Sequence, residues 1–350
     1  MNNLVIPAAG LSSRYPNMKP KWLLTHPDGK LMIEKILESF ETISYDRIII
    51  TILSKHCELY EADKILNQLF GEKIEVCILP EQTRDPAHTI YETIKTKKLE
   101  GLITIKDSDC IVEADFPLNR EFICGLEIDE YTQIENLQNK SYIIKCDKDL
   151  ITDIVEKQII SNLICVGVYC IDVDSFVEAY EKIISSPVTK IENEVFISHI
   201  LSYLVSKGTI VYFVPANRFV DWGTLSEWRK EQQRCSTYFF DIDGVLLKNT
   251  GRYGKINWSN SFEPIEENWK LLKDLSDNGA QIIFTTSRTE EYLEDFKSKL
   301  QKMQIKYKQI ITNCNHAQRI IINDFAPTNP YPSCDSISIP RNSSLKEYIK

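Results

Sequence analysis

The sequence has no excess of basic residues and no long apolar run, and each absence excludes a class of protein. Its 41 Lys and Arg are outnumbered by 50 Asp and Glu, which gives a formal net charge of −9. This balance argues against nucleic-acid or anionic-membrane binding as the main role, because both depend on basic surface. No apolar run approaches the about 18 residues of a membrane-spanning helix, and no leader pattern begins the chain. We therefore expect no membrane insertion and no nucleic-acid partner.

The cysteines also lack a pattern. The ten cysteines are scattered, without a CxxC pair and without the spacing of a zinc site. Most lie in apolar stretches such as "EVCIL" (75–79) and "LICVGVYC" (163–170), where a reduced cysteine behaves as a small hydrophobe. Free thiols without a disulfide framework indicate a reducing compartment, so we expect a cytoplasmic protein.

The chain is long enough for two α/β domains, each with its own core. Over the first 230 residues, apolar runs alternate with amphipathic stretches, and this alternation predicts βαβ units and a mostly parallel sheet. The expected strands lie at 3–8, 47–53, 74–79 and 101–109, and the expected helices near 30–41, 57–70 and 87–98. A new strand pattern begins at 237, so we place the domains at 1–233 and 234–350. No repeat and no Gly/Ser-rich tether is present.

Polar loops follow the expected strands, at the carboxyl ends where such sheets bind ligands. In "PAAGLSSRYPNMKPKWLL" (7–24), small residues would let backbone N–H groups wrap around phosphates, and three cations follow: Arg14, Lys19 and Lys21. "ITIKDSDC" (103–110) ends a strand in Asp107 and Asp109, which a cation must compensate if they are buried. A surface loop with incidental charges is the alternative for the first segment.

The string "AAGLSSR…KPK" (8–21) resembles the signature loop of nucleotidyltransferases that activate sugar phosphates. It is closer to the "AAGxGSR" form of cytidylyltransferases than to the "GGxGTR" form of many sugar-1-phosphate enzymes, which favours CTP. The resemblance covers roughly residues 1–230 in short motifs. It implies a Rossmann-like nucleotidyltransferase domain, similar to A-type glycosyltransferases, that couples an NTP to a sugar or polyol phosphate and releases pyrophosphate. A glycosyltransferase that uses a nucleotide sugar is the alternative.

The resemblance also implies roles for individual residues. Arg14 and Lys21 would stabilise charge on the transferring phosphoryl group, and Asp109 would hold Mg²⁺ with Asp221 of "FVDWGT" (219–224). Alternatively, Asp221 caps a helix that begins near Thr224. The implied nucleotide-binding residues are Ala8, Ala9, Gly10, Ser12, Ser13, Lys19, Gln82, Ala87, Thr89 and Asp107, with Gln82 and the backbone near Ala87 and Thr89 facing the base. Lys190 and Glu194 are candidates for the acceptor phosphate, although a solvated charged turn explains them almost as well.

"TYFFDIDGVLLKN" (237–249) resembles the first motif of the haloacid dehalogenase superfamily of phosphatases. The resemblance implies that Asp241 attacks phosphorus and that Asp243 protonates the leaving group. Thr286 and Ser287, after the next expected strand, would bind the phosphoryl group, with Arg319 as a candidate cation. Asp324, at the end of an expected strand "RIIINDFAP" (319–327), would complete a Mg²⁺ site with Asp241 and Asp243.

The short separation of the first two phosphatase motifs leaves no room for a large cap domain. The combined hypothesis is a bifunctional enzyme in which a small Rossmann-like phosphatase domain acts on a metabolite related to the acceptor. Such fusions fit the synthesis of bacterial capsule or surface-polysaccharide precursors. A C-terminal domain kept only for assembly is the alternative, and the sequence leaves the acceptor and a homo-oligomeric state open.

Overall fold

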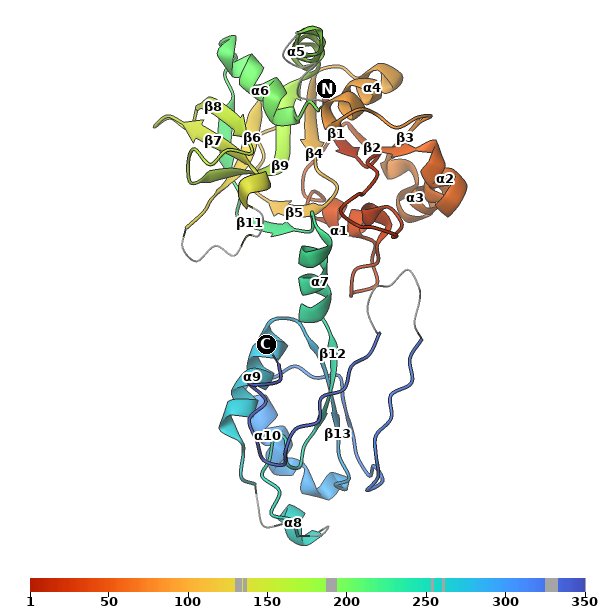
Figure 1. The fold of residues 1–350 in the computed structure, drawn as a ribbon, viewed down its shortest axis with the longest axis vertical. Coiled ribbons are helices and arrows are strands. Elements are labelled where there is room, and N and C mark those ends of the chain that lie inside the picture. The colour runs from red at the N-terminus through yellow and green to blue at the C-terminus, as the bar shows by residue number, and fades with distance from the viewer. Residues whose placement is uncertain are drawn as a thin grey trace. The chain divides into compact units, whose positions relative to one another are not determined.

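The computed structural model describes residues 1–129, 134, 137–186, 194–252, 255–259, 262–324 and 333–349. The chain divides into two compact units, unit 1 (Met1–Trp228) and unit 2 (Arg229–Lys350), which are drawn in Figure 1. The division falls inside helix α7 (Leu225–Arg234), five residues before the boundary placed from the sequence. No helix in the described part of the chain is both long and apolar enough to cross a membrane.

Unit 1 is built on one large sheet. Within the described residues this sheet has nine strands, in the order β10-β6-β9-β4-β1-β2-β3, with the β7–β8 hairpin beside β9. The strands are β1 (Asn2–Pro7), β2 (Arg47–Leu53), β3 (Glu75–Leu79), β4 (Leu102–Lys106), β6 (Phe122–Glu127), β7 (Ser141–Lys145), β8 (Ile151–Glu156), β9 (Leu163–Asp172) and β10 (Tyr212–Pro215). Strands β3, β2, β1 and β4 run parallel, as the predicted mostly parallel sheet requires. Strand β9 runs antiparallel to β4 and β6, and the β7–β8 hairpin is also antiparallel, so the sheet is mixed beyond β4.

Helices cover both faces of this sheet (Figure 1). Side chains that alternate along β1 enter different cores, because successive residues of a strand point to opposite faces. Val5 packs in the core that holds residues of α4 (Pro86–Lys97), α5 (Val173–Ser185) and α6 (Ile197–Ser206). Leu4 and Ile6 pack in the core that holds residues of α1 (Met32–Glu38) and α3 (Ala62–Phe70).

The helix predicted near 57–70 is two helices, so that prediction is wrong in its continuity. Helix α2 (Ser54–Tyr60) ends at Glu61, and α3 begins at the next residue. The backbone of Glu61 has φ +51°, in the left-handed region that an α-helix does not tolerate. The chain therefore turns at Glu61 although its apolar period continues.

A second, small sheet brings two distant acidic residues together. Strand β5 (Cys110–Glu113) pairs antiparallel with β11 (Arg218–Asp221), so that Asp221 stands opposite Cys110. The Trp222 N–H donates to the Asp109 carbonyl oxygen at 2.8 Å and continues this pairing past the strand ends. Asp109 and Asp221 are thereby held at one edge of unit 1.

Unit 2 is a smaller α/β unit with its own core. Within the described residues, its sheet consists of the parallel strands β12 (Thr237–Asp241), β13 (Gln281–Thr285) and β14 (Gln309–Ile311). Helices α9 (Glu266–Asp277) and α10 (Glu294–Lys302) supply Trp269 and Phe296 to the core, where they meet Phe240 and Phe284 of the sheet. Between β12 and β13 the described chain holds only α9 and the short α8 (Lys255–Ser259) as helices.

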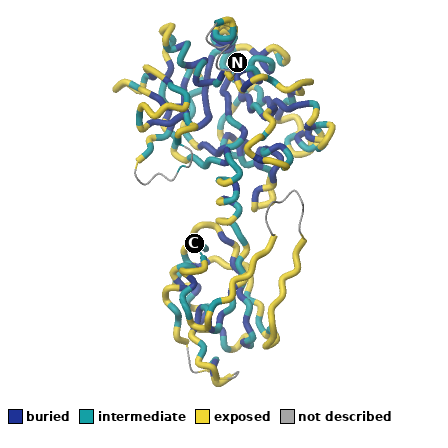
Figure 2. The backbone as a smooth tube through the Cα atoms, viewed as in Figure 1, coloured by how far each residue is buried: buried dark blue, intermediate teal, exposed yellow. Residues whose placement is uncertain are grey.

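The strand expected at the start of "RIIINDFAP" is wrong. Residues 319–324 form no strand, and Ile322 is 92% exposed. The third strand of the sheet is β14, which is formed by the earlier segment "QII" (Gln309–Ile311). Figure 2 shows this stretch of unit 2 as exposed chain. A run of β-branched residues favours a strand, but which run joins a sheet depends on its tertiary neighbours.

Candidate functional site

The loop after β1 folds back on itself and places Lys21 at the edge of the sheet. Its first residues, Ala8 and Ala9, are buried, and the Ala8 N–H donates to the Thr51 carbonyl oxygen at 2.8 Å. The Ser12 hydroxyl accepts the Lys21 backbone N–H at 3.1 Å, with Ser12 at φ +52°. The remaining predicted loop residues are exposed or half-buried: Gly10, Ser13, Arg14 and Lys19.

Two cations of this loop reach the first predicted metal ligand. The Lys21 ammonium donates to Asp109 Oδ2, and the Arg14 guanidinium lies 3.8 Å from the same oxygen. Burial alone would raise the pKa of Asp109, but Lys21 and then Arg14 outweigh burial and hold that pKa below its ordinary value. Asp109 is therefore an ionised carboxylate on which both predicted catalytic cations converge.

The second predicted ligand, Asp221, meets a lysine that the sequence did not single out. The Lys140 ammonium donates to Asp221 Oδ2, and the Gly223 N–H donates to Asp221 Oδ1 at 2.8 Å. The helix that follows is capped by other residues, because the Thr224 N–H donates to Glu227 Oε2 at 2.8 Å and the Glu227 N–H faces the Thr224 hydroxyl. The alternative in which Asp221 caps that helix is thus not what the geometry shows.

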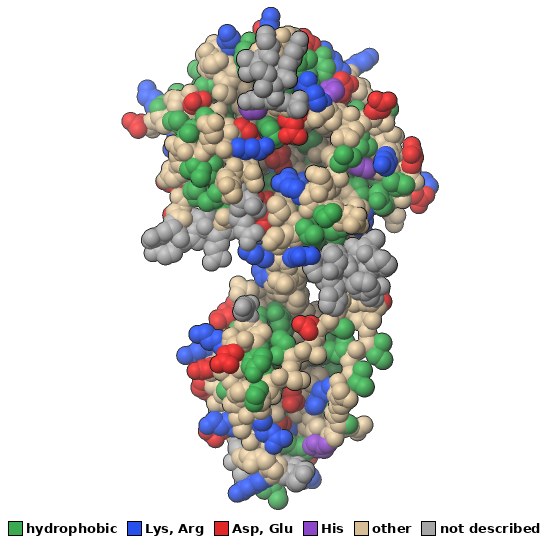
Figure 3. Space-filling view, in the orientation of Figure 1, with side chains coloured by type: hydrophobic (Ala, Val, Ile, Leu, Met, Phe, Trp, Pro, Cys, Tyr) green, Lys and Arg blue, Asp and Glu red, His purple; other side chains and the backbone are tan. Residues whose placement is uncertain are grey.

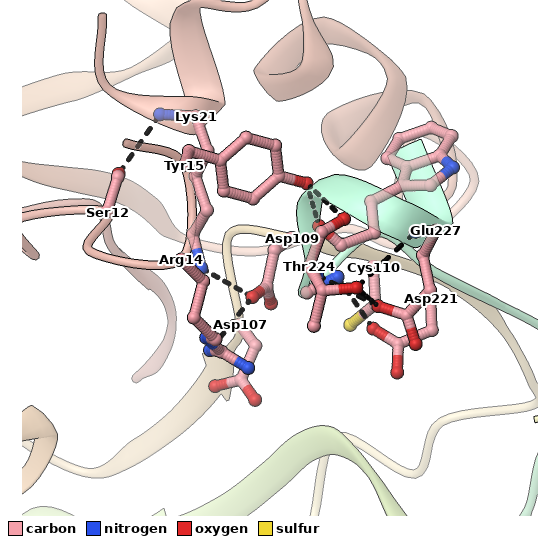
Figure 4. A network of polar contacts seen from close by, with 12 residues as sticks. Ser12, Arg14, Tyr15, Lys21, Asp107, Asp109, Cys110, Asp221, Thr224 and Glu227 are labelled. Atoms are coloured by element: carbon pink, nitrogen blue, oxygen red, sulfur yellow. Dashed lines mark hydrogen bonds and ion pairs between the residues drawn. The ribbon is translucent and has the colours of Figure 1, made fainter. Parts of the chain in front are cut away.

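The two carboxylates face one small space, which is defined by Gly223 (Figure 4). A Cβ built on Gly223 would lie 2.9 Å from Asp221 Oδ1, 3.5 Å from Asp109 Oδ2 and 3.4 Å from Arg14 Nη1. Only a residue without a side chain leaves this space open. Figure 3 shows basic and acidic side chains beside one another around a hollow on the drawn face of unit 1.

This donor set fits Mg²⁺ as a partner of bound phosphates. Within the described ranges, no group of three or more His, Cys, Asp and Glu side chains is arranged to hold a metal ion by itself. Mg²⁺ is commonly held by one or two carboxylates, with waters and substrate phosphates filling the other positions. Asp109 and Asp221 could supply those two carboxylates, and each is contacted by one ammonium group, that of Lys21 or of Lys140.

Asp107 lies two residues before Asp109, and both residues are half-buried. Burial raises the pKa of Asp107, and the Asp109 carboxylate adds to that effect. Gly167, at φ +77°, makes the room, because a Cβ there would lie 2.5 Å from Asp107 Oδ2. Below this turn the fully buried Lys106 ammonium donates to the carbonyl oxygens of Asp107 and Cys110 at 2.7 and 2.8 Å. The turn that carries Asp107 is thus held by backbone contacts, and the nucleotide-binding role of Asp107 stays a prediction.

Tyr15 ties the loop to the segment that carries Asp221. Its hydroxyl donates to the Trp222 carbonyl oxygen and also lies 3.0 Å from the Thr224 carbonyl oxygen. The ring is 2% exposed, and burial raises the pKa of the phenol. Because Tyr15 directly follows Arg14, this contact holds the backbone from which the Arg14 side chain extends. In the sequence Tyr15 is only an aromatic residue in a polar loop, so this role could not be predicted.

In the predicted base-reading segment, the backbone N–H groups expected to face the base already donate hydrogen bonds within the protein. The backbone N–H of Ala87 donates to the Val195 carbonyl oxygen at 3.3 Å, and that of Thr89 donates to the Asp85 carbonyl oxygen at 3.1 Å. The Thr89 hydroxyl lies 2.6 Å from the Thr83 hydroxyl. The Gln82 side chain is exposed and remains the predicted group that could read a base.

The structure describes few contacts for the two residues predicted to bind the acceptor phosphate. Lys190 lies outside the described residues, and Glu194 is exposed. Their roles stay predictions.

Unit 2 gathers several of its predicted residues at the ends of β12 and β13. Asp241 ends β12, with its Oδ1 3.3 Å from an Arg319 nitrogen. Burial raises the pKa of Asp241, although the nearby Arg319 lowers it and Asp243 raises it further. The Thr286 hydroxyl lies 3.5 Å from Asp243 Oδ2, and the half-buried Ser287 follows.

An arginine that the sequence did not assign holds Asp243. Arg288, 2% exposed, donates from Nη2 to Asp243 Oδ1 at 2.7 Å and from Nε to Oδ2 at 3.0 Å. Such a two-pronged contact orients a carboxylate. Asp324 is exposed, and its described hydrogen bonds are local, to Asn323 and Ser333. Its role as a Mg²⁺ ligand therefore stays a prediction.

Replacing Gly223 by alanine should disturb the site without disturbing the fold. The new methyl group would push Asp221 Oδ1 away from the Gly223 N–H that now holds it at 2.8 Å. We expect the activity of unit 1 to fall by about tenfold or more, because small displacements of positioned groups are costly. Steady-state rates of the Gly223→Ala variant and of the wild type, compared at several Mg²⁺ concentrations, measure the loss of activity. An unchanged rate with an unchanged melting temperature would show that the space at Gly223 serves no reactant.

Comparisons with known proteins bear on the fold. No protein-family model and no curated protein sequence matches the chain. A nucleoside-diphosphate-sugar pyrophosphorylase from Vibrio cholerae matches in structure over 66% of this chain and 99% of its own, with 19% identity and a TM-score of 0.56. An inositol-1-phosphate CTP transferase from T. maritima matches over 67% and 97%, with 14% identity and a TM-score of 0.52.

A UDP-glucose pyrophosphorylase complexed with UDP-glucose matches over 67% of this chain and 97% of its own, with 18% identity and a TM-score of 0.52. The covered share of this chain is close to that of unit 1, which ends at residue 228 of 350. At these identities the likeness shows the fold, and the Rossmann-like architecture expected for the first two thirds of the chain is confirmed.

Proposed function

We propose that unit 1 transfers a nucleotidyl group from a nucleoside triphosphate to the phosphate of a sugar or polyol phosphate and releases pyrophosphate. One observation carries this proposal. Arg14 and Lys21, from the loop after β1, converge on Asp109, which β5 and β11 hold beside Asp221. Two of the similar structures are named as pyrophosphorylases of nucleotide sugars and one as a CTP transferase for inositol-1-phosphate, and this supports the proposal.

The arrangement suits phosphoryl chemistry because it supplies charge and supplies no nucleophile. An acceptor phosphate oxygen would attack the α-phosphorus in line, the bond to the β,γ-diphosphate would break, and pyrophosphate would leave with its charge. Arg14 and Lys21 would bind the phosphoryl oxygens and stabilise the charge that develops there. Asp109 and Asp221 would hold Mg²⁺, which neutralises phosphate charge when it is bound. Tyr15 would keep the Arg14 loop in place.

CTP is the triphosphate that we favour. The loop "AAGLSSR" is closer to the cytidylyltransferase form, and one similar structure is named a CTP transferase. The glycosyltransferase alternative needs a diphosphate sugar and no pyrophosphate release. The loop that carries Arg14 and Lys21 argues against it, because glycosyltransferases bind a diphosphate sugar without that signature.

For unit 2 we propose a Mg²⁺-dependent phosphatase on a related phosphorylated metabolite. Its support is the meeting of Asp241, Asp243 and Thr286 at the ends of two neighbouring parallel strands. Asp241 would attack phosphorus, the ester bond would break, and water would then hydrolyse the aspartyl phosphate. A non-catalytic assembly domain is the second candidate. We place the whole chain in the synthesis of bacterial capsule or surface-polysaccharide precursors.

One assay tests both units. Pyrophosphate release is followed with CTP, UTP, GTP and dTTP against a panel of sugar and polyol phosphates, and free phosphate is followed in parallel. We expect pyrophosphate with one triphosphate, CTP, and one acceptor class. Free phosphate from a related ester would support the phosphatase. If the full chain releases no pyrophosphate with any pair, the proposal for unit 1 fails.

A further inference from the structure

Lys140 is a half-buried cation that neither the sequence motifs nor the proposed chemistry uses. It directly precedes β7, in the part of unit 1 that lies across β9 from the Arg14 loop, and 19% of its side chain is exposed. Its backbone is fixed at both ends, because its N–H donates to the Leu137 carbonyl oxygen and its carbonyl accepts the Lys157 N–H, each at 3.0 Å. The backbone from which the Lys140 side chain extends is therefore held in place.

The Lys140 side chain ends at a predicted metal ligand, Asp221. The Lys140 ammonium contacts Asp221 Oδ2 and lies 5.4 Å from the centre of the Phe219 ring. The Lys140 side chain is 19% exposed, so its ammonium is largely removed from water. A lysine that is desolvated in this way is costly unless it is paired. Asp221 is its partner in the structure described here.

The cations around the two carboxylates are divided between two sides. Arg14 and Lys21 contact Asp109 from the loop after β1, whereas Lys140 contacts Asp221 from the β7 side. A transfer reaction brings two anions, a triphosphate and an acceptor phosphate, to the same carboxylate pair. Arg14 and Lys21 belong to the loop that would bind the triphosphate. Among the described cations that contact the two carboxylates, Lys140 is then the one that could bind the second anion, the acceptor phosphate.

We propose that Lys140 occupies the cation position on Asp221 in the free enzyme and leaves it when metal and triphosphate bind, and that its ammonium then binds the acceptor phosphate. The inference rests on the proposed function of unit 1. It explains why a half-buried lysine stands at a carboxylate that is meant for a metal. The free site is neutralised by Lys21 and Lys140, so that the metal enters best together with the negatively charged triphosphate.

The first test is metal binding to the nucleotide-free full chain, with Mn²⁺ as the probe and electron paramagnetic resonance as the readout. Lys140→Met removes the competing charge, and we expect Mn²⁺ to bind about tenfold more tightly than to the wild type. Lys140→Arg keeps the charge and should bind Mn²⁺ as the wild type does. The matched control is Lys145→Met. Lys145 is the last residue of β7 and pairs with Asp149, so its replacement should leave Mn²⁺ binding unchanged.

The second test separates the two substrates. With Lys140→Met, we expect the KM for the acceptor to rise by about tenfold or more while the KM for the triphosphate stays near that of the wild type. Lys140→Arg should recover part of the loss. If Lys140→Met does not fold, Lys140→Gln is the second charge-free variant, because its amide can still donate to Asp221.

Two results would overturn the inference. Charge-free variants that bind Mn²⁺ no more tightly than the wild type would show that Lys140 does not compete for Asp221. A rise in the KM for the triphosphate alone would place Lys140 on the wrong substrate. The Mn²⁺ titration requires no turnover, so a wild-type chain without transferase activity would reject the proposed function and still leave the competition at Asp221 decided by that titration.

Discussion

Nucleotidyl transfer should fall by about 10²-fold or more when Lys21 is replaced by alanine, because the loss of one preorganised charge at the reacting phosphoryl group costs that much in related chemistry. In the structure the Lys21 ammonium lies on Asp109 and its backbone N–H is held by Ser12. The cation is therefore placed before substrate arrives. Steady-state rates of pyrophosphate release with saturating triphosphate and acceptor measure the loss in kcat.

The control for Lys21 is a lysine outside the site. Lys30 lies on the surface, 49% exposed, and pairs with Glu38, so Lys30→Ala should keep the wild-type rate. Lys21→Arg keeps the charge and should retain part of the activity. A Lys21→Ala protein that folds and still forms product at the normal rate would remove the basis of the proposed function of unit 1.

The parallel core of unit 1 was predictable because each of its strands has a recognisable local sequence pattern. Apolar β-branched runs such as "RIIITIL" are buried on both faces of a parallel sheet, and β2 covers that run from Arg47 to Leu53. The polar loops after β1 and β4 lie at the carboxyl ends of those strands, so the placement of Arg14, Lys21 and Asp109 near one edge also follows from the pattern.

The meeting of Asp109 with Asp221 was expected only through the resemblance. It depends on the pairing of β5 with β11, two short strands far apart in the sequence. Lys140 could not be predicted at all, because one lysine in "NLQNKSYII" looks like a surface charge. Its burial comes from the β7–β8 hairpin and from Asp221, which are both tertiary features.

Unit 2 shows the same limit. Arg288 ends the segment "TTSR" after a strand, where an exposed loop residue would be expected from the sequence. In the structure it is buried against Asp243. The run Ile320–Ile322 has the composition of a strand and is exposed instead. Local composition describes what a segment favours, and the partner that a segment finds in the fold decides what it becomes.

Replacing Asp241 by asparagine should abolish the release of free phosphate, by about 10⁴-fold or more, since the loss of a nucleophile removes the covalent route. An amide oxygen of the same shape cannot form the aspartyl phosphate. Asp241 stands at the end of β12, and an Arg319 nitrogen lies 3.3 Å from its Oδ1. Phosphate release from the ester that the wild type prefers is the measurement, and pyrophosphate release by unit 1 should continue at the wild-type rate.

Asp277→Asn is the matched control, because Asp277 is 56% exposed on α9 and pairs only with Lys273 in the described contacts. Its phosphate release should equal that of the wild type. A full chain that hydrolyses no phosphoester with Mg²⁺ present, while its Asp241→Asn variant folds and behaves identically, would favour the assembly domain over the phosphatase. Burial raises the pKa of Asp241, so a true nucleophile would also lose activity on the acid side at a higher pH than an exposed aspartate does, because the attacking form is the ionised carboxylate.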